Sequence, residues 1–164
     1  MNYLINTLII LAAFIAMEGV AWALHKYVMH TFLWKLHEDH HIRKNKVFQK
    51  NDFFAAIFGI PSWLLIMFGI MGGCDFRLYI GIGITLYGIG YMLIHDGLIH
   101  KRLKVFTHTK NIYLLGLLKG HLAHHIHDTD PDYKKENDVC YGMLWVPLKY
   151  FKKAKEELKN SSES

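Results

Sequence analysis

The chain has 164 residues, of which 52% are hydrophobic and 20% charged, with a formal net charge of +5. This length is that of one domain, and the apolar residues gather in long runs, which is typical of a small integral membrane protein rather than a soluble one. Lys and Arg flank those runs, so the positive charge indicates membrane topology and not nucleic-acid binding. The two cysteines, Cys74 and Cys140, are isolated in sequence, which excludes a disulfide framework or a zinc knuckle.

Three apolar runs are long enough to cross a membrane, because each has roughly the 20 residues that a hydrocarbon core of about 30 Å requires. They cover residues 3–24, 53–71 and 78–94. The first run has no basic segment before it and contains Glu18, so we expect an anchor that is kept rather than a cleaved signal peptide.

Two shorter apolar runs, 112–118 and 139–148, predict interfacial or re-entrant segments, so the chain has three or four spans. Residues 152–164 are a polar C-terminal tail, a charged helix end that gives way to polar residues, to which we assign no chemistry.

Basic residues lie between the first and second spans and again after the third, whereas the connection between the second and third spans has a single Arg. The positive-inside rule therefore places the long basic loop and the C-terminal part in the cytoplasm, and the N-terminus outside. The expected fold is an all-α integral membrane protein of the inner (cytoplasmic) membrane. A single domain, residues 1–164, forms a bundle of three to four transmembrane helices with a histidine-rich cytoplasmic cap.

Ten of the twelve histidines form a pattern that is written twice, an HxxxxH motif followed by an HxxHH motif. Neutral imidazole is the commonest metal-binding side chain, and all four motifs come where spans meet the predicted cytoplasmic face. Both His108 and His127 lie outside the pattern, and we expect no metal role for them. The ten candidate metal ligands are His25, His30, His37, His40, His41, His95, His100, His121, His124 and His125.

The two motifs differ in how they place their rings on a helix. In HxxHH the three rings share roughly one-third of the circumference, so they can face one metal. In HxxxxH the rings of a regular α-helix are about 140° apart. Either the helix loosens at this motif or the two rings approach the site from different sides.

Ten imidazoles exceed what one six-coordinate ion needs, so two metals are expected, and imidazole suits Fe, Zn, Cu or Ni alike. A structural zinc site would leave six of the ten unexplained. Carboxylates near the histidines are better placed to orient ring N–H groups than to bind metal. Glu18 either supports His25 in this way or makes a hydrogen bond between helices. The candidates for such support are Glu18, Asp39, Asp96 and Asp128.

Three segments carry a resemblance to a known family: HKYVMHTFLWKLHEDHH (25–41), YMLIHDGLIHKR (91–102) and HLAHHIHD (121–128). Over about residues 17–132 the chain resembles the bacterial β-carotene 3-hydroxylases, which belong to the fatty-acid hydroxylase and sterol desaturase superfamily of membrane non-haem di-iron enzymes. The resemblance implies that the ten histidines bind two iron ions, with O2 as co-substrate and a ferredoxin-type electron donor. It also implies that a carotenoid from the bilayer is hydroxylated at C3 of its β-ionone ring, from β-carotene to β-cryptoxanthin and then zeaxanthin.

Other functions stay open. Another membrane di-iron oxygenase, acting on a fatty-acyl, sterol or keto-carotenoid substrate, would share the histidine pattern. A membrane haem protein would need paired histidines inside facing spans, whereas these lie at span ends. A metal-ion transporter would need ligands near the middle of the bilayer, where this chain offers Glu18 and little else.

Overall fold

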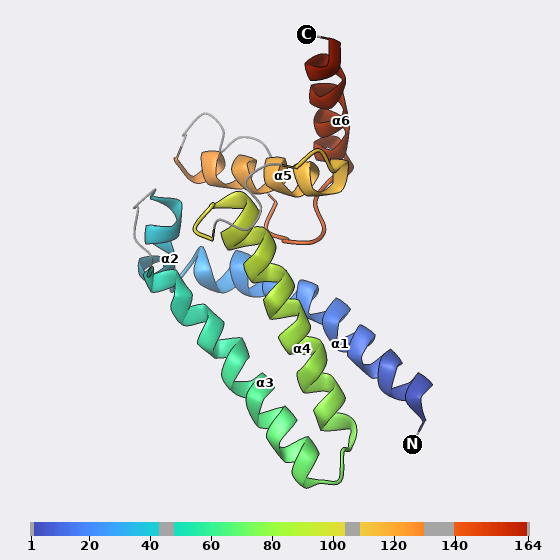
Figure 1. Ribbon diagram of the computed structural model, residues 1–164. Coiled ribbons are helices and arrows are strands. Elements are labelled where there is room, and N and C mark those ends of the chain that lie inside the picture. The colour runs from blue at the N-terminus through green and yellow to red at the C-terminus, as the bar shows by residue number, and fades with distance from the viewer. Residues whose placement is uncertain (1, 43–47, 104–108, 130–139, 164) are drawn as a thin grey trace. The chain divides into compact units, whose positions relative to one another are not determined.

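The computed structural model describes residues 2–42, 48–103, 109–129 and 140–163, and all regular structure in these ranges is helical, which confirms the all-α prediction (Figure 1). The chain forms two compact units, Met1–Gly90 and Tyr91–Ser164. The first unit contains α1 (Tyr3–Leu24), η1 (His25–Met29), α2 (Trp34–His41), η2 (Lys50–Asp52), α3 (Phe53–Met71) and α4 (Phe76–Tyr91). The second begins at the last residue of α4 and contains η3 (Met92–Ile99), α5 (Ile112–Thr129) and α6 (Leu148–Glu163).

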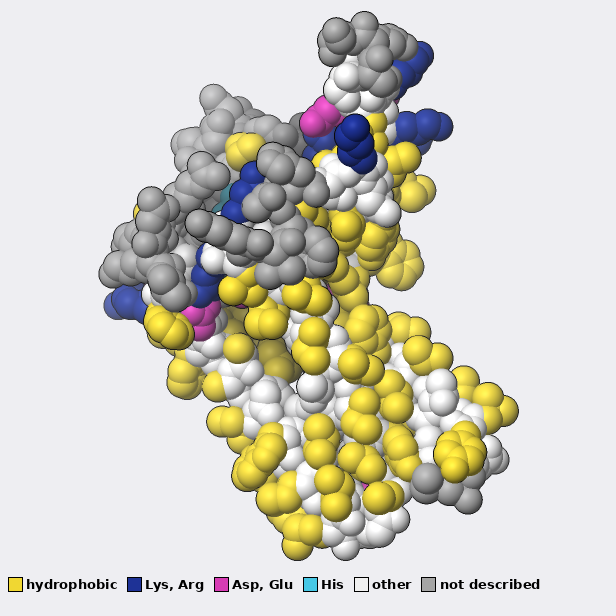
Figure 2. Space-filling view, viewed as in Figure 1, with side chains coloured by type: hydrophobic (Ala, Val, Ile, Leu, Met, Phe, Trp, Pro, Cys, Tyr) yellow, Lys and Arg dark blue, Asp and Glu magenta, His cyan; other side chains and the backbone are white. Residues whose placement is uncertain are grey.

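Three of the described helical segments are long and apolar enough to cross a membrane: Tyr3–Met29, Lys50–Met71 and Phe76–Ile99. Each contains one of the predicted runs. Many large apolar side chains of these helices point outward, among them Tyr3 and Ile15, which are 77% and 69% exposed. Figure 2 shows hydrophobic side chains spread over the visible surface of α1, α3 and α4. An outer surface of this kind suits contact with lipid rather than water.

Helices α3 and α4 run side by side in opposite directions and pack through small residues (Figure 1). A Cβ atom at Gly81 would lie 2.8 Å from the Ser62 carbonyl oxygen, so only glycine allows this approach. At the same contact, the Ser62 hydroxyl donates to the Gly81 carbonyl oxygen at 2.8 Å and lies 2.7 Å from the Thr85 hydroxyl. Small residues and hydrogen bonds of this type are what hold helices together in lipid, where the hydrophobic effect between helices is absent.

Helix α1 packs on α4 in a similar way. A Cβ at Gly83 would lie 2.6 Å from the Ile10 carbonyl oxygen, and the rings of Phe14 and Tyr87 meet edge to face. The Tyr87 hydroxyl donates to a Glu18 carboxylate oxygen at 2.7 Å. The interhelical hydrogen bond, which was one of the two expectations for Glu18, is therefore present, and support of His25 by Glu18 stays a prediction.

The second unit has its core where α5 meets α6 and the segment before it. The buried residues of this core are Leu117, Cys140, Val146 and Tyr150. Helix α5 extends well beyond the short apolar run expected at 112–118. The charged helix end expected in the tail is present, and α6 continues as far as Glu163. Helix α6 buries the apolar side of an otherwise charged helix, with Tyr150 and Ala154 inside.

Candidate metal centre

Both HxxxxH motifs lie in π-helical segments. The His30 N–H donates to the His25 carbonyl oxygen at 3.2 Å, and the His100 N–H donates to the His95 carbonyl oxygen at 2.9 Å, which are i→i+5 bonds. The wider turn brings each pair of rings together, with centroids 4.8 Å apart for the first motif and 4.6 Å for the second. Of the two expectations for this spacing, the loosened helix is the one that the structure has. Single π-turns in α-helices occur often at functional sites.

The HxxHH motifs lie on regular α-helices, the first on α2 and the second on α5. The Nε2 atoms of His37 and His41 are 3.0 Å apart, and those of His121 and His125 are 2.9 Å apart. The middle histidine of each motif, His40 or His124, is buried beside the others. The i and i+4 rings therefore share one helix face, as the spacing predicts.

Within the first unit, the two motifs bring four imidazoles together, and we call this set the first histidine cluster. Its members are His25, His30, His37 and His41, whose ligand nitrogens all lie within 4.8 Å of one another. The Nε2 of His37 is at the centre, 3.1 Å from that of His25 and 3.0 Å from that of His41. Four side chains from two helical elements thus point their nitrogens at one small volume.

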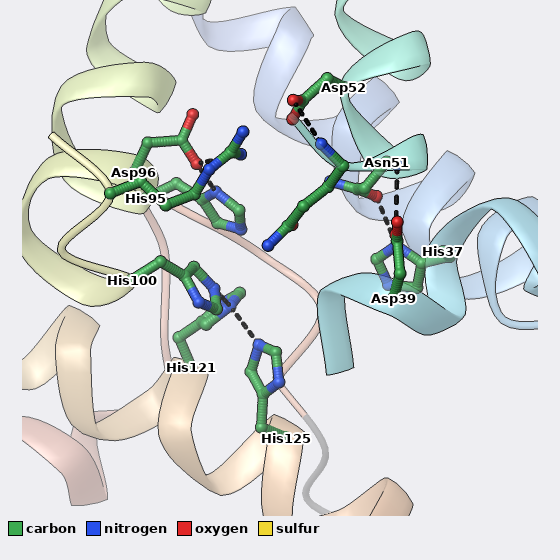
Figure 3. Close-up of polar contacts among 11 residues, drawn as sticks. His37, Asp39, Asn51, Asp52, His95, Asp96, His100, His121 and His125 are labelled. Atoms are coloured by element: carbon green, nitrogen blue, oxygen red, sulfur yellow. Dashed lines mark hydrogen bonds and ion pairs between the residues drawn. The ribbon is translucent and has the colours of Figure 1, made fainter. Parts of the chain in front are cut away.

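The second unit repeats this arrangement with the second copy of the pattern. Its cluster, the second histidine cluster, contains His95, His100 and His121, with ligand nitrogens within 4.8 Å of one another, and His125 beside them. Here His121 is central, since its Nε2 lies 3.1 Å from that of His100 (Figure 3). The doubled sequence pattern is therefore a doubled structural one, because histidines of one copy lie close together within each compact unit.

Burial lowers the pKa of His121 well below the ordinary value of 6.5, and the neighbouring histidines of the second cluster lower it further. Positive charge is costly in a buried group of this kind and more so beside other imidazoles that can protonate. His121 is therefore neutral at physiological pH, which is the form of imidazole that binds metals.

The spacing of the nitrogens fits a metal ion. Two ligands that each bond an ion at about 2.1 Å, as imidazole does with zinc, and that meet there at about 90° are about 3.0 Å apart. The Nε2 pairs in the two clusters are separated by 2.9–3.1 Å. Imidazole ligands accept several transition metals, so the nitrogens fit an ion of this class without identifying it.

Other polar side chains hold the rings from outside the clusters. His95 Nδ1 lies 2.9 Å from an Asp96 carboxylate oxygen (Figure 3). The same oxygen accepts from Arg102 at 3.3 Å. In the first unit, His37 Nδ1 lies 2.7 Å from the side-chain oxygen of Asn51. Asp39 accepts from the backbone N–H groups of Lys50 and Asn51.

Asn51 is the residue that sequence reasoning missed. It is an amide rather than a carboxylate and lies ten residues after the nearest histidine. The only indication in the sequence that Asn51 has a role is its position as a polar residue just before an apolar span. The side chain of Asp128 lies outside the described residues, as do the side chain of His127 and all of His108.

Comparisons with known proteins confirm the resemblance found in the sequence. Residues 10–145 match the family model described as fatty acid hydroxylase. The chain is 41% identical to the β-carotene hydroxylase of Pseudescherichia vulneris over 87% of this chain and 78% of that protein. It is 36% identical to the β-carotene hydroxylase of Pantoea ananas over 90% of this chain and 81% of the other.

A plant protein, the chloroplastic β-carotene 3-hydroxylase 1 of Arabidopsis thaliana, is 37% identical over 82% of this chain and 42% of its own length. No solved structure matches the chain significantly.

Proposed function

The chain belongs to the fatty acid hydroxylase family, and from this premise we propose that it hydroxylates carotenoid β-ionone rings at C3. β-Carotene would become β-cryptoxanthin and then zeaxanthin. The observation that carries this proposal is the identity of 41% and 36% to two bacterial β-carotene hydroxylases, along most of both chains. Fragmentary similarity confined to the histidines would support only a member of the family with an unspecified substrate.

The ten histidines of the doubled pattern are proposed to hold two non-haem iron ions. Such ions, when bound, supply the reductive activation of O2 that a hydroxylation needs. The overall reaction consumes the substrate C–H bond, O2, two electrons and two protons, and it yields the C–OH bond and water. A ferredoxin-type protein is the proposed source of the electrons.

The side chains of this protein have three tasks in that reaction. The imidazoles of the two clusters would hold the ions, and burial keeps His121 in the neutral form. Asp96 accepts from the ring of His95 and so fixes which of its nitrogens is available. The apolar helices keep water away and offer a hydrocarbon substrate a route from the bilayer.

The proposed location is the inner membrane, with the histidines at the cytoplasmic face and the N-terminus outside. The basic residues that flank the spans support this orientation, because the sequences that follow α2 and η3 are both rich in Lys and Arg. A soluble electron donor in the cytoplasm would then meet the same face.

The test is pigment analysis, by chromatography and mass, of a β-carotene-accumulating bacterial host that expresses the chain. We expect β-cryptoxanthin and zeaxanthin. The variants His40→Ala and His124→Ala should make neither pigment while remaining in the membrane, because each removes a proposed ligand. Unchanged β-carotene with the wild-type protein present in the membrane would refute the carotenoid substrate, and keto-carotenoids would assign a different oxidation.

The second candidate is hydroxylation of a fatty-acyl chain, which the description of the matching family favours. The same expression experiment separates the two, since hydroxylated fatty acids would appear in the lipid extract of a host in which the pigments do not change.

A further inference from the structure

We propose that Asn51 is a positioning residue for the first histidine cluster, where its side-chain oxygen holds His37 in the tautomer that can bind metal. The inference rests on the proposed metal centre and goes beyond it, because it concerns a neutral residue outside the histidine pattern. Asn51 would not touch the ion itself and would act through His37.

The contact defines the tautomer. The Asn51 side-chain oxygen lies 2.7 Å from His37 Nδ1, and a carbonyl oxygen can only accept. Nδ1 therefore carries the proton, and Nε2 of the neutral ring is left with its lone pair. That Nε2 is the atom at the centre of the first cluster, 3.1 Å from His25 and 3.0 Å from His41.

Both partners are removed from solvent, so water cannot easily replace either one. His37 is 2% exposed and Asn51 is 8% exposed. A buried hydrogen bond of good length fixes ring orientation as well as protonation, whereas a ring that is held only by packing can rotate about its Cβ–Cγ bond.

The chain holds Asn51 in place through a short turn that precedes α3. In this turn, the Gln49 N–H donates to the Asp52 carboxylate at 3.0 Å and the Asp52 N–H donates to the Gln49 carbonyl oxygen at 3.0 Å. Asp39 accepts from the Lys50 N–H at 2.7 Å and from the Asn51 N–H at 3.4 Å. The turn is thus closed on itself and also tied to a neighbouring helix.

The helix that ties down this turn is the one that carries His37. Asp39 and His37 are both on α2, so one short helix presents the imidazole and also anchors the backbone of its partner (Figure 3). Asp39, a candidate to orient a histidine ring, binds the backbone N–H groups of Lys50 and Asn51. Its effect on the cluster is carried by Asn51.

In the second unit a histidine ring is held in the same way, but by a charged acceptor. There the acceptor for His95 is the carboxylate of Asp96, which also binds Arg102. In both units, therefore, a side-chain oxygen holds one histidine of the cluster through Nδ1. A histidine that donates to an amide is a weaker metal ligand than one that donates to a carboxylate. We therefore expect His37 to be a weaker electron donor than His95.

The experiment uses the full-length protein in detergent, stripped of metal with a chelator and titrated with Co²⁺, whose absorption reports imidazole coordination. Wild type is compared with Asn51→Ala, which removes the acceptor, and with Asn51→Asp, which keeps an acceptor oxygen at the same position. Asp52→Asn is the matched control, because it alters the same turn without touching His37. Circular dichroism of each variant establishes that the helices are intact.

We expect Asn51→Ala to bind one Co²⁺ about 10–100-fold more weakly than wild type, with the other ion unaffected. Asn51→Asp and Asp52→Asn should titrate close to wild type. The inference is overturned if Asn51→Ala titrates like wild type, or if Asn51→Asp or Asp52→Asn loses as much affinity as Asn51→Ala, since the turn rather than the acceptor would then matter. A wild-type protein that takes up no Co²⁺ would instead refute the proposed metal centre.

Discussion

Replacement of Gly81 by alanine tests whether the close contact of α3 and α4 holds the spans together. The added Cβ would lie 2.8 Å from the Ser62 carbonyl oxygen, 3.0 Å from the Ile66 backbone nitrogen and 2.7 Å from an Ile66 side-chain carbon. The Ile66 side chain can turn away, but the two backbone atoms cannot. The helices must therefore separate locally.

The expected cost has two parts. Overpacking of a tight contact costs about 1–3 kcal/mol. Separation of the helices also weakens the hydrogen bond from Ser62 to the Gly81 carbonyl oxygen, which contributes about 0.6 kcal/mol for an average bond between membrane helices. The better helix propensity of alanine offsets up to about 1 kcal/mol. We expect a net loss of unfolding free energy of about 0.5–3.5 kcal/mol from these principles combined.

Gly88→Ala is the control, because Gly88 is on the same helix and a Cβ there would meet nothing within 4 Å. It should be neutral or stabilising by up to about 1 kcal/mol. The measurement is the free energy of unfolding in mixed detergent micelles, followed by loss of helicity on titration with a denaturing detergent. Equal stability of the two variants would show that the glycine contact between α3 and α4 is not a determinant of stability.

Three further predictions concern the metal centre and the spans. Asp96→Ala should lower metal affinity by about 10–100-fold, measured by competition with a chelator, whereas Asp96→Asn, which retains an acceptor oxygen, should lose less. Tyr87→Phe, which removes the donor to the Glu18 carboxylate, should destabilise the protein by about 0.5–2 kcal/mol in the same unfolding assay, and no change would mean that this bond is not a significant contact between α1 and α4. For the metal-free protein, the lowered pKa of His121 means that the unfolded chain binds more protons than the folded one below about pH 6.5. Stability should then fall on acidification by up to about 1.4 kcal/mol per pH unit from this group, and His121→Gln should flatten the dependence.

Several features of the fold and the site could be predicted from residue types and spacing alone. Runs of about 20 apolar residues predict spanning helices because the backbone must satisfy its own hydrogen bonds in lipid, and hydropathy is a local property. The HxxHH geometry was also predictable, since i and i+4 share a face of any α-helix. Each of these inferences depends on residues close together in the sequence.

What lay beyond prediction depends on residues that are distant in sequence or on small changes in the backbone. Residue spacing allowed two arrangements for HxxxxH, and the choice of a π-turn was decided by the tertiary fold, which places His25 and His95 against the HxxHH helix of their own unit. Likewise, Glu18 could have faced His25 or another helix, and the position of Tyr87, 69 residues away, provides the interhelical partner.

The amino-acid sequence by itself determined the three apolar helices, the ten histidines and their twofold repeat, because hydropathy and helical periodicity are written in neighbouring residues. Only the tertiary structure decided that histidines of one copy lie close together within each unit, that π-turns join the rings, and that Asn51 rather than a carboxylate holds His37. A hydrogen bond between side chains from different helical elements depends on where the backbone carries them. That position is a property of the packed molecule and not of either residue.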